Sequence, residues 1–260
     1  MKLTVAAVQY NISWQNKEEN FSRLNMLLQE VEADIIILPE MFQTGFSMES
    51  EKLAEKENGK TLQWMQNKAK EKNAAITGSF IVEENNTYYN RLFWVNPDGN
   101  YYTYNKRHLF RMAGEHQYFS AGKKLTVVEY KGFKFLPLIC YDLRFPVWSR
   151  NVKDKQPIYD CLLYVANWPE PRTYAWSKLL EARAIENLCY VIGVNRCGKD
   201  GNNIEYKGSS AIIDFKGNAL QTAKPFSEEI IYSTLNLESL KLFREKFPAY
   251  LDADDFELKL

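Results

Sequence analysis

Short apolar runs, each about as long as a β-strand, alternate along this chain with segments whose apolar residues recur at helical spacing. The runs that we expect to form strands are 4–9, 34–38, 74–81, 133–139, 161–166 and 189–194. Runs that are apolar throughout are typical of strands covered on both faces, and strands that alternate with helices form layered folds. The order of these runs therefore predicts an α/β fold.

The segments between the runs have the pattern of helices that pack on a sheet. Helices are expected at 16–32, 61–72 and 174–187, because apolar residues recur there every three or four positions. In the last of these helices, Leu179, Ala182 and Ile185 should share the face that contacts the sheet.

The middle and the end of the chain add antiparallel strands. Segments 87–96 and 100–105 flank Pro97-Asp98-Gly99, a strong turn signal, and so predict a hairpin. A closing β region is expected at 209–214, 219–222 and 230–235, followed by a short helix at 237–247. The sheets should therefore be mixed.

We expect residues 1–260 to form a single domain, since the sequence contains no linker, repeat or low-complexity tract. α/β folds of about 250 residues often form one domain. The last residues, 248–260, are rich in Asp and Glu but keep apolar side chains such as Leu251 and Phe256. We expect this tail to dock on a neighbouring surface.

The charge balance and the cysteine content indicate which kind of ligand and which cellular compartment to expect. Lys and Arg balance Asp and Glu at 33 each, so a small polar ligand is expected rather than nucleic acid or a membrane surface. No stretch approaches the roughly 20 apolar residues of a membrane-spanning helix, and the N-terminal run is too short for an export signal. These features indicate a cytoplasmic protein. Its 4 cysteines should stay reduced, and their spacing does not fit a zinc site.

Three reactive side chains follow strand-like runs, at the strand ends where the sites of α/β proteins cluster. Glu40 follows an apolar run, Lys106 follows the hairpin, and Cys140 comes directly after 133–139. Each has a simpler explanation by itself: a loop glutamate, a solvated basic residue and a small core thiol. Brought into one pocket, they supply a base, a cation for an oxyanion and a nucleophile. Together they predict a hydrolase that works through a thioester.

A resemblance to a known family favours this catalytic interpretation. Leu-Pro-Glu-Met-Phe around Glu40, Tyr-Asn-Lys-Arg-His-Leu-Phe around Lys106 and Ile-Cys-Tyr-Asp-Leu-Arg-Phe-Pro around Cys140 resemble the signature segments of the nitrilase, or carbon–nitrogen hydrolase, superfamily. The order of the segments agrees, and the resemblance extends over nearly the whole chain. Segments 106–116, 140–150 and 164–169 are similar to those of bacterial omega-amidases, which hydrolyse the terminal amide of 2-oxoglutaramate and related compounds.

The resemblance implies a four-layer αββα sandwich and a homodimer. It also implies that Glu40, Lys106 and Cys140 are catalytic, and that Glu115 is a second acid that supports the lysine or orients substrate. The alternative for Glu115 is a surface carboxylate. No Gly-x-Ser-x-Gly motif and no phosphate-binding glycine loop occurs, so we expect neither cofactor nor metal.

Other residues are expected to bind the substrate. The backbone N–H of Tyr141 should donate to the oxyanion. Arg144 could bind a substrate carboxylate with its two-pronged guanidinium or pair with Asp142 or another internal acid, and the sequence leaves both open. The side chains expected to wall a small, dry pocket are Phe42, Phe46, Tyr141 and Trp168. His108 is expected to be structural rather than the base of a Cys-His pair.

Three functions remain open on the sequence. A nitrilase or an N-carbamoyl hydrolase would use the same catalytic residues on another carbon–nitrogen bond, so pocket shape must decide between these and an amidase. Loops 45–59 and 168–174 are expected to set that shape. A scaffold that keeps the fold without turnover is the third interpretation, and the intact set of catalytic residues argues against it.

Overall fold

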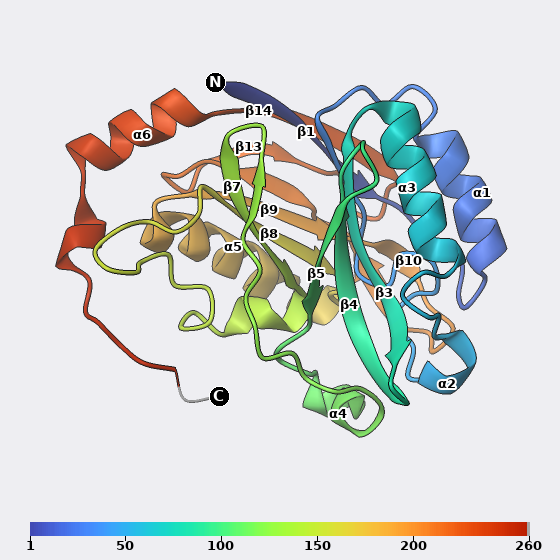
Figure 1. Cartoon of the computed structure of the whole chain (residues 1–260). Coiled ribbons are helices and arrows are strands. Elements are labelled where there is room, and N and C mark those ends of the chain that lie inside the picture. The colour runs from blue at the N-terminus through green and yellow to red at the C-terminus, as the bar shows by residue number, and fades with distance from the viewer. Residues whose placement is uncertain (259–260) are drawn as a thin grey trace.

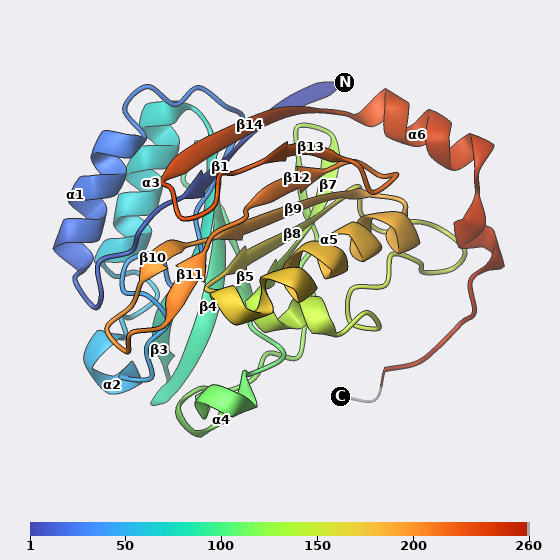
Figure 2. The same cartoon turned by 180° about the vertical axis from the view of Figure 1, so that it is seen from behind.

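The computed structural model describes residues 1–258 and arranges them in four layers: helix, sheet, sheet, helix (Figure 1). Two six-stranded sheets lie face to face in the middle. Helices α1 (Lys17–Leu27) and α3 (Lys60–Lys72) cover the outer face of one sheet, and α5 (Thr173–Asn187) covers that of the other (Figure 2). The αββα sandwich predicted from the sequence is confirmed.

The first sheet has the strand order β14-β1-β2-β3-β4-β5. Its strands are β1 (Lys2–Gln9), β2 (Ile35–Ile37), β3 (Ala75–Glu84), β4 (Thr87–Val95), β5 (Tyr101–Asn105) and β14 (Glu229–Asn236). β1, β2 and β3 run parallel, whereas β14, β4 and β5 are added by antiparallel pairing. The β4–β5 pair is the predicted hairpin.

The second sheet has the order β13-β12-β9-β8-β7-β6. Its strands are β6 (Val128–Tyr130), β7 (Phe133–Ile139), β8 (Cys161–Ala166), β9 (Tyr190–Asn195), β12 (Ala211–Ile213) and β13 (Ala219–Thr222). β7, β8 and β9 are parallel, and the remaining pairings are antiparallel. Both sheets are therefore mixed, as the sequence predicts.

The remaining elements lie between or after these strands and helices. They are α2 (Ser50–Leu53), α4 (Glu115–Tyr118), α6 (Leu237–Lys246), the small pair β10 (Cys197–Lys199) and β11 (Glu205–Lys207), and the 3-10 turns η1 (Arg111–Ala113), η2 (Cys140–Arg144), η3 (Glu170–Arg172) and η4 (Ala249–Asp252). Of the helices in residues 1–258, none is both long and apolar enough to cross a membrane.

Successive side chains of a strand belong to different clusters of the hydrophobic core. Val5 and Ala7 of β1 belong to the cluster between the sheets, whereas Ala6 and Val8 belong to the cluster beneath α1 and α3. Successive side chains of a strand point to opposite faces of a sheet, so a strand that is apolar throughout must be covered on both sides. This is why the uninterrupted apolar runs predicted buried strands correctly.

Helix α5 packs on a different face from the one that we expected. Trp176 and Leu180 face the sheet, whereas Ile185, which we placed on the sheet side, is 54% exposed. Gly193 of β9 explains the choice, because a Cβ atom there would come within 2.8 Å of Trp176 and 2.5 Å of Leu180. The missing side chain lets two large residues approach the strand, and this contact sets the rotation of the helix.

The C-terminal tail remains a prediction. As far as residue 258, it runs from α6 along the side of the molecule (Figure 1), and Leu251 and Phe256 stay 47% and 50% exposed. The backbone oxygen of Ala253 accepts a hydrogen bond from Lys155. Residues 259–260 of the predicted docking segment lie outside the described residues.

Candidate active site

Cys140 occupies a strained position where β7 meets η2. Its φ angle is +44°, which is uncommon for a residue with a side chain and is often found at functional sites. The residue is 8% exposed, and its Sγ lies 3.8 Å from the backbone oxygen of Asn167. The sharp turn from strand to 3-10 helix thus presents a thiol at a strand end, as the sequence predicts.

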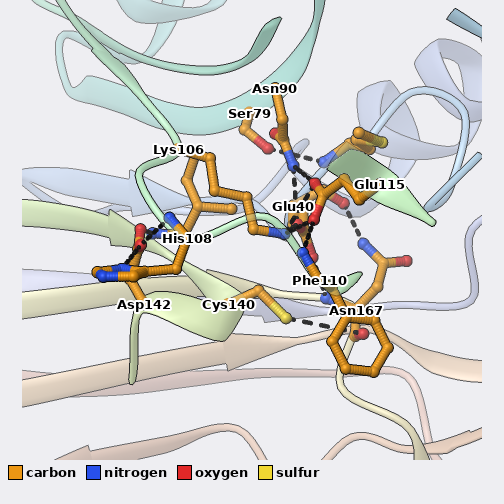
Figure 3. Close-up of polar contacts among 12 residues, drawn as sticks. Glu40, Ser79, Asn90, Lys106, His108, Phe110, Glu115, Cys140, Asp142 and Asn167 are labelled. Carbon is orange, nitrogen blue, oxygen red and sulfur yellow. Dashed lines mark hydrogen bonds and ion pairs between the residues drawn. The ribbon is translucent and has the colours of Figure 1, made fainter. Parts of the chain in front are cut away.

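Glu40 is fully buried and its carboxylate is held by donors from three parts of the chain. It accepts hydrogen bonds from Lys106 Nζ at 2.8 Å, Asn90 Nδ2 at 2.8 Å and the backbone N–H of Asn167 at 2.9 Å. Buried carboxylates cost free energy unless they are paired and hydrogen-bonded, and these contacts satisfy that need. They fix the carboxylate beside the thiol of Cys140 (Figure 3).

Lys106 is 1% exposed and lies between two carboxylates. Its Nζ donates to Glu40 Oε1 at 2.8 Å and to both carboxylate oxygens of Glu115, at 3.0 and 2.9 Å (Figure 3). Burial works against the charge of Lys106, but the two carboxylates outweigh it and raise the pKa of this ammonium above its usual value. Lys106 therefore stays charged inside the protein.

Glu115 opens helix α4 and is also fully buried. Burial raises the pKa of its carboxyl, while Lys106 pulls that pKa down. The backbone N–H of Phe110 donates to the same carboxylate. Glu115 is thus not the surface carboxylate that the sequence left open, and it contacts the lysine directly.

The thiol of Cys140 rests in its neutral form. Burial, followed by the negative charge of Glu40, raises the pKa of this thiol well above its usual value, and Lys106 only partly offsets the shift. The thiolate is the nucleophilic form of cysteine. A nucleophilic role would therefore require a base to remove the proton, and Glu40 is the carboxylate beside this thiol.

Asp142 connects the segment that carries Lys106 to the turn that carries Cys140. It accepts hydrogen bonds from the backbone N–H and Nδ1 of His108, at 2.9 and 2.7 Å, from Tyr104 Oη at 2.8 Å and from the backbone N–H of Ile139 at 3.0 Å. His108 therefore has the structural role that we expected. Asp142 is engaged by these donors and forms no ion pair with Arg144 within residues 1–258.

A pocket opens in front of the thiol. Its lining residues are Phe46, Lys106, Phe110, Ala113, Cys140, Tyr141, Arg144, Asn167, Trp168, Pro169, Arg172, Ile204 and Tyr206. Among them are Phe46, Tyr141, Arg144 and Trp168, which the sequence predicts to wall the pocket or to bind the substrate.

The prediction that Phe42 helps to wall the pocket was wrong. Phe42 is fully buried in the cluster beneath α1 and α3, where its ring packs against Trp64 and Phe80, and it does not line the pocket. The apolar character of Leu-Pro-Glu-Met-Phe predicted burial, but could not tell on which side of the first sheet the ring would lie.

The site residues that the sequence did not single out include Asn90 and Arg172. Asn90 is a buried amide of β4 that lies between Tyr89 and Arg91, and nothing local in the sequence distinguishes it from an ordinary strand residue. Arg172 lies in loop 168–174, which we expected to shape the pocket, but nothing local in the sequence indicates where its side chain points. Both were missed because their partners are distant along the chain.

The chain is similar to known carbon–nitrogen hydrolases in sequence and in structure. The family model described as carbon–nitrogen hydrolase matches residues 4–245. The omega-amidase YafV of Escherichia coli K12 is 44% identical over 259 residues, covering 98% of each chain. A 2-oxoglutaramate amidase of Bacillus subtilis is 34% identical over 257 residues, covering 97% of this chain and 98% of that protein. The crystal structure of a CN-hydrolase superfamily protein from Xanthomonas campestris, described with an arsenic adduct in its active site, superposes with a TM-score of 0.97 at 43% identity over 100% of both chains.

Proposed function

Because this chain belongs to the carbon–nitrogen hydrolase family, we propose that it is an omega-amidase that acts through a thioester on Cys140. The reaction is hydrolysis of the terminal amide of a small substrate that carries a carboxylate, such as 2-oxoglutaramate, to the acid and ammonia. The full-length similarity to an omega-amidase and to a 2-oxoglutaramate amidase supports this choice among carbon–nitrogen hydrolases.

The observation that carries the proposal is the convergence of Glu40, Lys106 and Cys140 in one buried cluster. These residues follow β2, β5 and β7, and the ammonium of Lys106 lies 2.8 Å from the carboxylate of Glu40. A charged lysine with two carboxylates is costly to bury. Its place beside a thiol that lines a pocket favours a catalytic function over a purely structural one.

In the first half of the reaction, Glu40 removes the proton of the Cys140 thiol while the sulfur attacks the amide carbon. A carbon–sulfur bond forms and the carbonyl oxygen becomes an oxyanion. The N–H of Tyr141 lies in the first turn of η2, where helical N–H groups have no partner within the helix, and it binds the oxyanion together with Lys106. Protonated Glu40 then gives its proton to the nitrogen, and ammonia leaves.

In the second half, water hydrolyses the thioester. Glu40, again a carboxylate, takes a proton from the attacking water, and the same donors bind the second oxyanion. Breakdown of this intermediate expels the sulfur, which recovers a proton from Glu40. Glu115 acts as a positioning residue, because its two contacts with Nζ keep Lys106 in place through both halves.

Arg144 supplies the contact for the substrate carboxylate. Within residues 1–258 its guanidinium has no acidic partner, and it lies over the ring of Trp168, with 5.1 Å between Cζ and the ring centre. A planar guanidinium that stacks on an aromatic ring keeps its N–H groups available for two parallel bonds to a carboxylate. This favours the carboxylate-binding alternative that the sequence left open for Arg144.

We also propose that residues 1–260 form one domain and that the protein is a homodimer in the cytoplasm. The tail, residues 248–260, is proposed to dock on a neighbouring surface. The exposed apolar side chains of the tail, with Leu251 at 47% and Phe256 at 50%, support a docking role. Light scattering of the purified protein, compared with a variant truncated after Lys246, tests the dimer and the tail together. A monomeric full-length protein would contradict the dimer, and a truncated protein that assembles unchanged would contradict the role of the tail.

The activity is tested by ammonia release from a panel of compounds, with the Cys140→Ala variant as the control. The panel contains 2-oxoglutaramate, a short neutral amide, an aliphatic nitrile and an N-carbamoyl amino acid. We expect the highest kcat/KM with 2-oxoglutaramate, no ammonia from the variant, and a Cys140 adduct in the mass spectrum of wild-type protein quenched during turnover. Preference for the nitrile or the carbamoyl compound would replace the amidase assignment, and no ammonia from any compound would favour a scaffold.

A further inference from the structure

A second arginine, Arg172, faces the same pocket as Arg144. It ends η3, the turn that follows β8, whereas Arg144 ends η2. Its guanidinium lies over the ring of Phe110, with 5.3 Å between Cζ and the ring centre. As far as residue 258, neither arginine has an ion pair or hydrogen bond from its guanidinium to another residue.

The side chains that line the pocket carry a net positive charge, which favours binding of an anion. The lining contains Lys106, Arg144 and Arg172, and no Asp or Glu among the described residues. The charge of Lys106 is already matched by Glu40 and Glu115. Two positive charges therefore remain at the pocket for a ligand to neutralise, and one substrate carboxylate uses only one of them.

Trp168 holds both arginines in place. It is 3% exposed, its backbone N–H donates to Asn195 Oδ1 at 2.7 Å, and its indole N–H donates to the backbone oxygen of Arg172 at 2.8 Å. The guanidinium of Arg144 rests on its ring. One buried side chain thus fixes the backbone of one arginine and the head group of the other, which reduces the cost of ordering them around a ligand.

We propose that Arg172 and Arg144 together form a two-point site for the 2-oxo acid end of the substrate, and that Arg172 selects 2-oxo acids over 2-amino acids. This inference rests on the proposed omega-amidase function. The guanidinium of Arg144 binds both oxygens of the carboxylate, and the guanidinium of Arg172 donates to the neighbouring 2-oxo oxygen. A 2-ammonium group would instead meet two cations and no carboxylate at the pocket lining, and like charges repel.

Binding to the inactive Cys140→Ala protein tests the site without turnover. Calorimetric titration with 2-oxoglutaramate and with L-glutamine should show tighter binding of the 2-oxo compound. Adding Arg172→Gln should weaken binding of 2-oxoglutaramate by about 10- to 100-fold, the usual effect of losing a hydrogen bond to a charged group. The affinity for L-glutamine should change less, so the ratio of the two affinities falls.

Two further variants separate recognition from a structural effect. Arg172→Lys keeps the positive charge but lacks the two parallel N–H donors of a guanidinium, and it should retain part of the selectivity that Arg172→Gln loses. Arg150→Gln is the matched control, because the Arg150 guanidinium donates to the backbone oxygen of Glu186 and does not line the pocket. Arg150→Gln should bind both compounds like the parent protein.

The proposal is overturned if Arg172→Gln binds 2-oxoglutaramate as tightly as the parent, or loses both compounds by the same factor. It is also overturned if the Cys140→Ala protein binds neither compound. Ammonia release by the wild-type enzyme is measured separately. Turnover of 2-oxoglutaramate by the wild type with unchanged selectivity in Arg172→Gln would refute the role of Arg172 and leave the proposed function intact.

Discussion

Replacement of Lys106 by methionine should remove both the charge balance of the buried cluster and a donor to the oxyanion. Methionine approximates the length of the lysine stem but carries no charge. Glu40 and Glu115, both fully buried, would then face each other without the ammonium that lies 2.8 and 2.9 Å from them. Two carboxylates without a cation between them cannot both stay ionised at low cost.

The expected loss in the free energy of unfolding is about 3–5 kcal/mol, the usual effect of breaking a buried ion pair. Typical domains unfold at about 5–15 kcal/mol, so the variant should still fold. Turnover should fall by at least about 100- to 1,000-fold, because one oxyanion donor is lost. Urea unfolding and ammonia release from 2-oxoglutaramate measure the two effects on the same protein.

The destabilisation should also depend on pH. Lys106 lowers the pKa of Glu115 against the effect of burial, so its removal raises that pKa further. A group whose pKa is raised in the folded state contributes stability at low pH, and this contribution is lost as the pH rises through the folded-state pKa. The variant should therefore be closest in stability to the wild type near pH 5 and furthest from it near pH 8.

Lys131→Met is the matched control, since Lys131 pairs with Asp34 at the surface and is 47% exposed. Exposed pairs contribute about 0–1 kcal/mol, so this variant should keep its stability and its turnover. Turnover of Lys106→Met within about tenfold of the wild type would refute the role of Lys106 as an oxyanion donor. An equal loss of stability at pH 5 and pH 8 would refute the role of Lys106 in keeping Glu115 ionised.

Other expected outcomes follow from the same contacts. Cys140→Ala should fold with an unchanged midpoint of thermal unfolding and release no ammonia; measurable turnover would contradict the nucleophile. The thiolate absorbance at 240 nm, taken as the difference between wild type and Cys140→Ala, should titrate above the usual thiol pKa, and Glu40→Gln should lower its midpoint because the Glu40 charge raises that pKa. A midpoint near pH 7 in the wild type would contradict the neutral thiol. Asp142→Asn should reduce the free energy of unfolding by about 1–3 kcal/mol in urea, because a buried donor then loses its acceptor; no change would contradict the connecting role.

The local pattern of the sequence determined the layers and the positions where reactive residues leave the strands. The runs 133–139 and 161–166 coincide with β7 and β8, because a strand covered on both faces must be apolar at every position. Cys140 could therefore be placed at a strand end before its surroundings were known. The family resemblance added the pairing of this thiol with Glu40 and Lys106.

Only the tertiary structure decided which atoms meet. Local patterns describe neighbours along one element, whereas the contacts of Glu40 with Asn90 and Asn167 join segments far apart in the sequence. The same limit explains the two wrong predictions. Phe42 and Ile185 have the apolar character of buried residues, but the packing of Trp176 and Leu180 on Gly193 and the position of the outer helices fixed which faces were covered.

The carboxylate cluster has the same physical origin. A lysine beside two glutamates is stable in the interior only when all of its donors are satisfied in three dimensions, and spacing along the chain cannot specify that geometry. The sequence by itself thus determined the fold class and the order of Glu40, Lys106 and Cys140 along the chain, and its family resemblance indicated the type of reaction. The tertiary structure decided that Glu115 holds Lys106, that Asp142 binds His108 rather than Arg144, and that Arg172 reaches the pocket.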